Sequence, residues 1–167
     1  MSLETTLQQL YDLPISSTIR ENVNAFPLIE SLHVLAITLV FGTILIVDLR
    51  LVGVAAHRRS ADRLIRELLP YTWVAFALAV ISGSLLFISN APAYAANVEF
   101  QLKLVTIVLA GINMAIFHST AHRRIADWDM DLPPPAAARV SGLLSLALWT
   151  VVILLGRWIG FTLDVLF

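Results

Sequence analysis

Residues 31–47 read SLHVLAITLVFGTILIV and contain no Asp, Glu, Lys or Arg. The same absence of charge marks three further stretches: 68–98, 104–122 and 140–156. A bilayer core about 30 Å thick is crossed by roughly 20 helical residues. Four such stretches occupy most of a chain of 167 residues. The sequence therefore predicts an all-α integral membrane protein, built as a four-transmembrane-helix up-down bundle.

The composition supports this class and excludes others. Hydrophobic residues make up 58% of the chain and charged residues 14%, whereas soluble domains carry about 25% charged residues. The net charge of −1 and the dispersed basic residues argue against nucleic-acid binding. The chain has no Cys, which excludes disulfides, thiolate metal sites, iron–sulfur clusters and covalently attached haem. Any cofactor must be held by His, Met, Lys or oxygen ligands.

Pro, turn and polar signals predict where the spans begin and end. The expected spans run from after Phe26-Pro27 to about Ala56, from Pro70-Tyr71 to Asn90, from Phe100 to His122, and from Ala138 to Gly160 or beyond. Residues 27–167 then form the transmembrane domain. Residues 1–26 form an N-terminal periplasmic segment, either with an interfacial helix over residues 7–11 or as an unordered tail.

The arginines predict the orientation. Seven of the 11 basic residues lie in two connections: Arg58, Arg59, Arg63 and Arg66 in one, and Arg123, Arg124 and Arg139 in the other. By the positive-inside rule both connections face the cytoplasm and both termini lie outside. We expect a multi-pass protein of the bacterial cytoplasmic (inner) membrane. A homo-oligomer is expected too, because a single small bundle shields a large cofactor poorly from lipid, and the Gly156/Gly160 spacing suits close helix contact.

Ionisable residues inside spans are functional candidates, because hydrocarbon penalises them. All four histidines lie in or at the ends of the first and third spans, which run in the same direction. His33 and Lys103 begin these spans, at the outer surface. His57, His118 and His122 end them, at the inner surface, with His118 and His122 spaced i, i+4 on one helix face.

Two imidazoles from different helices of a bundle can hold a b-type haem. The best supported axial pair is His57 with either His118 or His122. Two alternatives stay open: the histidines are ordinary interfacial residues, or they bind zinc or copper.

Neighbouring residues fit a flat cofactor. Gly53 lies four residues before His57, and Gly111 lies seven before His118, so each shares a helix face with its histidine and leaves room for a ring. Arg50 is suited to a haem propionate. Asp48 is expected to be buried as a structural acceptor, and each of Asp48 and Arg50 to pair with a neighbouring helix or subunit.

The outer end contains His33, Lys103 and, by helical rise, Arg157. This group is expected to hold a second haem, or to handle protons for a small acidic substrate or a quinone. The structural alternative is a hydrogen-bonded tie between Glu30, His33 and Lys103.

The run from Leu32 to Gly42, continued by Asp48-Leu49-Arg50-Leu51, resembles the first helix of a bacterial family of small, uncharacterised four-helix membrane proteins. More distantly it is similar to the CopD-like and HemJ-type membrane proteins. The features that match the HemJ type are Leu32-His33, His57, Lys103-Leu104 and His118. This resemblance implies b-type haem, with His33 and Lys103 as the functionally required pair. The chain departs from the HemJ type at residues 46–50 and at Phe117-His118, where that type has Tyr-Leu-Pro-Arg and Tyr-His segments.

The sequence thus predicts a membrane-embedded b-type cytochrome with one or two haem b per chain. It would transfer electrons at or across the cytoplasmic membrane, with a redox partner or quinone that the sequence does not identify. One alternative is a HemJ-like protoporphyrinogen oxidase. Another is a CopD-like copper-handling protein, which is less well supported because Met114 is the single thioether in the spans.

Overall fold

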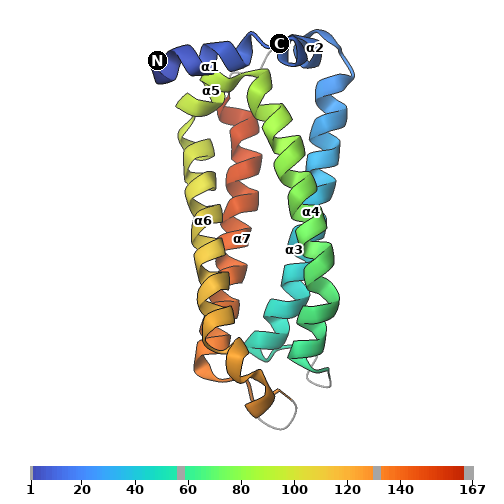
Figure 1. The fold of residues 1–167 in the computed structure, drawn as a ribbon, viewed down its shortest axis with the longest axis vertical. Helices are drawn as coiled ribbons and strands as arrows, with labels where there is room; N and C mark the ends of the chain where they lie inside the picture. Colours follow the sequence, from blue (N-terminus) through green and yellow to red (C-terminus); the bar gives the residue numbers. More distant parts are fainter. Residues whose placement is uncertain (1, 56–58, 130–132, 164–167) are drawn as a thin grey trace.

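The computed structural model describes residues 2–55, 59–129 and 133–163 of the chain, and the regular structure within these ranges is helical throughout (Figure 1). Its elements are α1 (Leu3–Tyr11), α2 (Pro14–Glu21), α3 (Ala25–Val52), α4 (Ala61–Ser89), α5 (Ala91–Ala96), α6 (Val98–Ser119), the 3-10 helix η1 (His122–Asp127) and α7 (Ala136–Thr162).

Four helices, α3, α4, α6 and α7, are long and apolar enough to cross a membrane. The shortest, α6, has 22 residues and is therefore about 33 Å long. Large apolar side chains such as Leu39, Leu109 and Leu154 are exposed on the outside of the bundle. An apolar exterior of this kind suits contact with lipid, so the predicted all-α, four-span membrane fold is confirmed.

The bundle consists of two antiparallel hairpins. In the first hairpin α3 packs against α4, in the second α6 packs against α7, and contacts between α3 and α7 join the two. Helices α4 and α6 form no comparable interface. In Figure 1, α4 belongs to the first hairpin and α6 to the second. Helices α1, α2 and α5 lie at the end of the bundle where α7 finishes, and η1 lies at the other end (Figure 1). The Arg-rich connections thus lie opposite the N-terminal helices, as an up-down bundle requires.

Helix α3 begins close to its predicted start but ends earlier than predicted. Gly53 has φ 85°, in the left-handed region, which glycine adopts without steric cost. Its N–H donates to the Arg50 carbonyl (3.2 Å), and the Val54 N–H donates to the Leu49 carbonyl (3.0 Å). This is the hydrogen-bond pattern of a Schellman motif, so the predicted end near Ala56 was wrong.

Helix α4 begins nine residues before the predicted start at Pro70, which lies inside the helix. The Ser60 side chain caps α4 by accepting from the Arg63 N–H (3.1 Å). The first turns also carry the ion pairs Arg63–Glu67 and Asp62–Arg66 at i, i+4, which stabilise a helix in water. The apolar run marks the membrane-crossing part of α4, and the preceding polar turns extend the helix beyond it.

The third span also ends earlier than predicted. Thr120 leaves the helical conformation (φ −117°, ψ −88°), so that α6 stops at Ser119 and His122 begins the separate 3-10 helix η1. His118 and His122 therefore do not lie on one continuous helix, and the same-face inference from their spacing was wrong. Helix α7 begins two residues before the predicted fourth span and ends at Thr162, in agreement with the predicted end at Gly160 or beyond.

The N-terminal segment is ordered as α1 and α2, which includes the helix expected over residues 7–11. Ser16 Oγ donates to the Ile88 carbonyl (2.7 Å) and Arg20 Nη1 donates to the Ser89 carbonyl (2.9 Å). Both acceptors lie in the last turn of α4, where carbonyls lack helical partners. The Arg20 guanidinium also covers the Tyr11 ring at 3.7 Å. Helix α2 thereby caps α4 and anchors the segment to the bundle.

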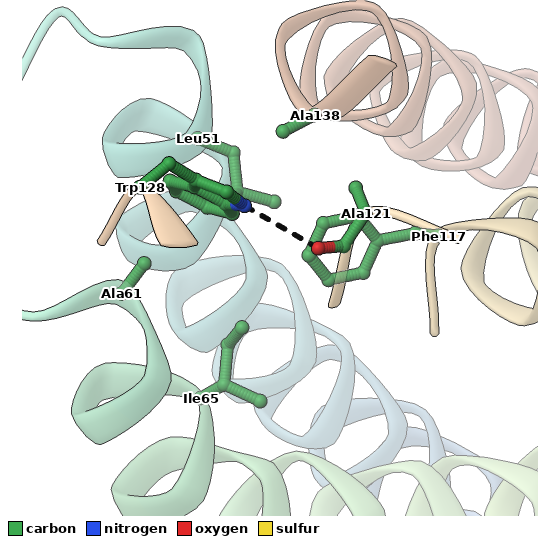
Figure 2. Packing of buried hydrophobic residues seen from close by; sticks show 7 residues of the cluster. All are labelled: Leu51, Ala61, Ile65, Phe117, Ala121, Trp128 and Ala138. Atoms are coloured by element: carbon green, nitrogen blue, oxygen red, sulfur yellow. Dashed lines mark hydrogen bonds between the residues drawn. The ribbon is translucent and has the colours of Figure 1, made fainter. Parts of the chain in front are cut away.

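A hydrophobic cluster closes the other end of the bundle (Figure 2). Its buried members are Leu51, Ala61, Ile65, Phe117, Ala121, Trp128 and Ala138. The Trp128 indole N–H donates to the Ala121 carbonyl at 3.4 Å, drawn as the dashed line in Figure 2. Residues of α3, α4, α6, α7 and the α6–α7 connection meet here, which positions the segment that carries His118 and His122.

Candidate functional site: a cavity between the two hairpins

A cavity of about 270 Å³ lies between the hairpins and is lined by α3, α4, α6 and α7. Most of its lining is apolar, including the rings of Trp73, Phe76 and Trp149. The polar lining residues are Thr43, Asp48, Thr72, Asn113, His118, Ser141 and Ser145. A mainly apolar cavity with a few convergent polar groups is typical of small-molecule sites.

The cavity opens between α4 and α6. Of its lining residues there, Trp73 is 50% exposed and Met114 37% exposed. Gly111 is exposed, and a Cβ added to it would meet no atom within 4 Å. We call this side, formed by Trp73, Gly111, Met114 and His118, the mouth. Because α4 and α6 are long and apolar enough to cross a membrane, we expect the mouth to face lipid.

Hydrogen bonds at two places join the helices that line the cavity. The Thr43 and Thr72 hydroxyls lie 2.8 Å apart and join α3 to α4. Asn113 Nδ2 donates to the Ser141 carbonyl (3.0 Å), and Ser141 Oγ donates to Asn113 Oδ1 (3.1 Å), which joins α6 to α7. These groups are satisfied within the protein and hold each hairpin together.

Asp48 lies on the opposite side of the cavity from the mouth, on α3. It is 5% exposed, and its backbone carbonyl lies against Gly142 of α7. Its Oδ2 atom is buried without a hydrogen-bond partner. Asp48 and Ser145 both line the cavity, and we call them the floor. The expectation that Asp48 is buried against a neighbouring helix is confirmed.

His118 is held in one tautomer. Its Nδ1 lies 2.9 Å from the Met114 carbonyl, and because a carbonyl only accepts, Nδ1 carries the hydrogen. In the neutral imidazole, Nε2 is then the nitrogen that carries the lone pair. His118 and Gly111 both line the cavity, so the predicted proximity of this glycine to this histidine is confirmed.

His122 lies beside His118, although it belongs to η1. The ring centroids are 5.1 Å apart, and Nδ1 of His122 is buried without a partner. Burial, with a smaller contribution from His118, lowers the pKa of His122 below its ordinary value of 6.5. The inner histidine group therefore contains two adjacent imidazoles. His57, the predicted third member, lies outside the described residues.

Arg50 and Gly53 have structural roles at the end of α3. The Arg50 guanidinium donates from Nε to the Arg59 carbonyl (2.8 Å) and from Nη2 to the Asp129 carbonyl. It is 3% exposed and does not line the cavity. Gly53 ends α3, and a Cβ there would have Pro134 as its neighbour at 3.9 Å. Neither residue faces the cavity as a cofactor-binding role would require.

At the outer end, His33 and Lys103 each lie against a glycine of the other helix in their hairpin. His33 Nδ1 lies 3.0 Å from Ser82 Oγ, and a Cβ added to Gly83 would lie 2.9 Å from His33 Cε1. A Cβ added to Gly156 would lie 3.3 Å from Lys103 Nζ. The Lys103 charge acts on the His33 ring, so the structure brings the predicted pair into one layer.

The other predicted members of the outer group lie on the surface. Arg157 is next to Gly156 and thus at the expected depth, but it is exposed and its guanidinium stacks on the Phe161 ring at 4.7 Å. Glu30 is exposed as well. The hydrogen-bond partner of His33 is Ser82, so the tie expected between Glu30, His33 and Lys103 is replaced by a contact within the first hairpin.

Sequence reasoning missed most of the cavity's polar lining: Thr43, Thr72, Ser141 and Ser145. One signal was present. Thr43 and Asn113 are 70 positions apart, as are Asp48 and His118, and all four line the cavity. Corresponding positions of the first helix of each hairpin therefore face the same space.

No curated protein and no solved structure matches the chain. A family model matches residues 21–162, which include the four long helices. This agrees with the predicted small membrane protein family and adds no similarity to the HemJ-type or CopD-like proteins. The chain belongs to a family of unknown function, DUF6644.

Proposed function

We propose that the protein is a membrane-embedded b-type haem protein that transfers electrons within the bilayer. The observation that carries the proposal is His118. Its Nδ1–H is bound to the Met114 carbonyl, and its ring lines a cavity that opens to lipid. When one imidazole nitrogen binds a metal, a hydrogen bond from the other ring nitrogen fixes the orientation of the ring.

The residues of the mouth fit a flat cofactor. Gly111 leaves open space on the face of α6 that carries His118. The cavity of about 270 Å³ is slightly below the roughly 300–1,000 Å³ of pockets for drug-sized ligands. A porphyrin would therefore extend through the mouth into the gap between α4 and α6, where no packed interface opposes it.

The remaining ligand and the propionate partners belong to the same proposal. His57, which lies outside the described residues, is the proposed axial partner. Arg50 is buried in its ion pair with Asp129. Arg66 pairs with Asp62 on the surface, where an ion pair is weak, and its charge acts on the ring of His122. Arg66 is thus the better candidate for a propionate. Bound haem would supply a one-electron iron couple, and the protein would supply the axial nitrogen and the apolar surroundings that tune its potential.

The test is the absorption spectrum of the purified protein in detergent, with pyridine haemochrome analysis of the haem-to-protein ratio. We expect a Soret band and b-type haem, both lost or strongly shifted in His118→Ala. Met114→Leu is the matched control, because it changes the same wall but keeps the carbonyl that binds Nδ1. Absence of a Soret band after expression with added haem precursor, and after addition of haem, would exclude the proposal.

A second candidate is a HemJ-like oxidase, and one observation favours it. The Ser82 hydroxyl donates to the Leu78 carbonyl (2.7 Å), so it accepts from His33 Nδ1–H and leaves Nε2 of His33 unprotonated. Lys103 acts on this ring from the second hairpin. A base and a cation in one layer suit an acidic tetrapyrrole substrate. Complementation of a strain that lacks protoporphyrinogen oxidase, lost in Lys103→Ala, would support this candidate over electron transfer alone.

No observation favours the copper-handling alternative. Among the described residues, no group of three or more His, Cys, Asp or Glu side chains is arranged to hold a metal ion.

A further inference from the structure

Asp48 lines the cavity, and its Oδ2 atom is buried without a hydrogen-bond partner. A buried polar atom without a partner costs free energy, and such atoms are rare in native proteins. Among the described residues, the cavity lining contains no Lys or Arg, and His118 is the one other titratable side chain. A ligand that brings a hydrogen-bond donor to the Asp48 carboxyl would offset this cost.

The walls next to the floor suit one aromatic ring. Phe76 lies edge-on to Trp149, with ring centroids 6.4 Å apart, and edge-on to Trp73 at 5.9 Å. All three rings line the cavity, and aromatic edges and faces attract a further ring. The volume of about 270 Å³ suits a single substituted ring.

The route to the cavity restricts the ligand further. The mouth lies between two membrane-crossing helices, so the ligand arrives from the hydrocarbon region. A permanently charged molecule is strongly disfavoured there. A hydroxyl crosses at much lower cost, and a carboxyl accepts a hydrogen bond from it in either protonation state.

From these observations we infer that the floor, Asp48 with Ser145, binds a lipophilic molecule with a hydroxyl on an aromatic ring, a phenol or a hydroquinone. The hydroxyl donates to the Asp48 carboxyl, and the ring packs against Phe76 and Trp149 where they line the cavity. The site lies behind the mouth and requires no iron. It shares the cavity with the proposed haem, so it is tested separately, on the haem-free protein.

The test uses the full chain in phosphatidylcholine nanodiscs, with and without added haem, and fluorine NMR of three probes. These are para-trifluoromethylphenol, its methyl ether, which keeps the oxygen but lacks the donor, and trifluoromethylbenzene. Empty nanodiscs correct for partition into lipid. We expect saturable binding of the phenol, about tenfold tighter than the other two probes, as one hydrogen bond to a carboxyl group predicts.

Two variants locate the site. Asp48→Leu fills a similar volume without an acceptor and should abolish the preference for the phenol. Thr72→Val is the matched control, because it removes a cavity hydroxyl that is already paired with Thr43, and it should leave the preference unchanged.

Equal affinity of wild-type protein for the phenol and its methyl ether would overturn the inference, and this comparison needs no variant to fold. A preference that survives Asp48→Leu would also overturn it, as would tighter binding of para-trifluoromethylbenzylamine, since that would make the floor a cation site. A Soret band bears on the proposed function alone, and the comparison of the phenol with its methyl ether is decided on the haem-free protein, because haem would occupy the same cavity.

Discussion

Arg50 and Asp129 are 79 positions apart in the chain, and Arg50 Nη2 lies 3.6 Å from Asp129 Oδ1 in an ion pair whose side chains are 4% and 10% exposed. The Asp129 carboxylate also accepts from Ser60 Oγ and from the first backbone N–H groups of α4. An anionic group is favourable at a helix N-terminus. A single carboxylate thus connects the end of α3, the start of α4 and the α6–α7 connection.

Asp129→Ala should destabilise the protein by about 3–5 kcal/mol, because it leaves the buried Arg50 charge without its partner. Asp127→Ala, two residues away and exposed, is the control and should change stability by less than about 0.5 kcal/mol. Reversible unfolding in mixed detergent, followed by circular dichroism, measures both. Equal stability of the two variants would show that the ion pair contributes nothing.

Gly142→Leu should separate the hairpins. A Cβ at Gly142 would lie 3.1 Å from the Asp48 carbonyl oxygen and 3.2 Å from the Leu51 side chain, so a larger side chain forces α7 away from α3. We expect a loss of about 1–3 kcal/mol, typical of overpacking. Gly160→Leu has open space around it and should be neutral or stabilising by up to roughly 1 kcal/mol. Thermal unfolding compares the two, and a stable Gly142→Leu protein would contradict the packing of α3 on α7.

Tyr94 should make stability depend on alkaline pH. Burial, with the charge of Glu30 adding to it, raises the pKa of Tyr94 from 10.0 to about 12. The unfolded chain then loses this proton first as the pH rises, so the contribution is unchanged below about pH 10 and is lost progressively towards pH 12. The loss is on the order of 2 kcal/mol.

Unfolding midpoints measured at rising pH should therefore fall less steeply in Tyr94→Phe than in the wild type. Near-ultraviolet absorbance of tyrosinate, compared between the wild type and Tyr94→Phe, gives an independent check. A single tyrosinate transition near pH 10 in the wild type would rule out the raised pKa.

The natural absence of Cys allows a direct test of orientation. In intact bacteria, Glu4→Cys on α1 should react with a membrane-impermeant maleimide. Asp127→Cys, at the end of η1, should react after the cells are opened. Labelling of Asp127→Cys in intact cells, with Glu4→Cys protected, would reverse the orientation that the positive-inside rule predicts.

The membrane-crossing helices were predictable, because the cost of burying charge in hydrocarbon leaves an unambiguous pattern. Their ends were less so. The apolar pattern continues past Gly53, and nothing in the composition shows that the backbone of this glycine adopts the left-handed conformation. At the start of α4, hydropathy ends with the membrane while the helix continues into water, supported by Ser60 and by charged pairs. At Thr120 the backbone turns although the residue types still suit a helix.

The candidate site was predictable in part. The depth of His33, Lys103 and His118 followed from helical rise, which depends on chain position alone. Which face each side chain presents depends on the pairing of α3 with both α4 and α7, and spacing does not encode this pairing. Arg50 is an example: its partner Asp129 lies in the α6–α7 connection, where no periodic sequence pattern predicts which residues meet.

The mouth between α4 and α6 has a consequence for any measurement on this protein. Since it faces hydrocarbon, acyl chains of the surrounding lipid are always present at concentrations that no added ligand reaches. The apparent affinity for any occupant is therefore a ratio against displaced lipid, and it should shift with acyl-chain length and unsaturation while the protein itself stays unchanged. For this cavity the bilayer is a competitor as well as a solvent.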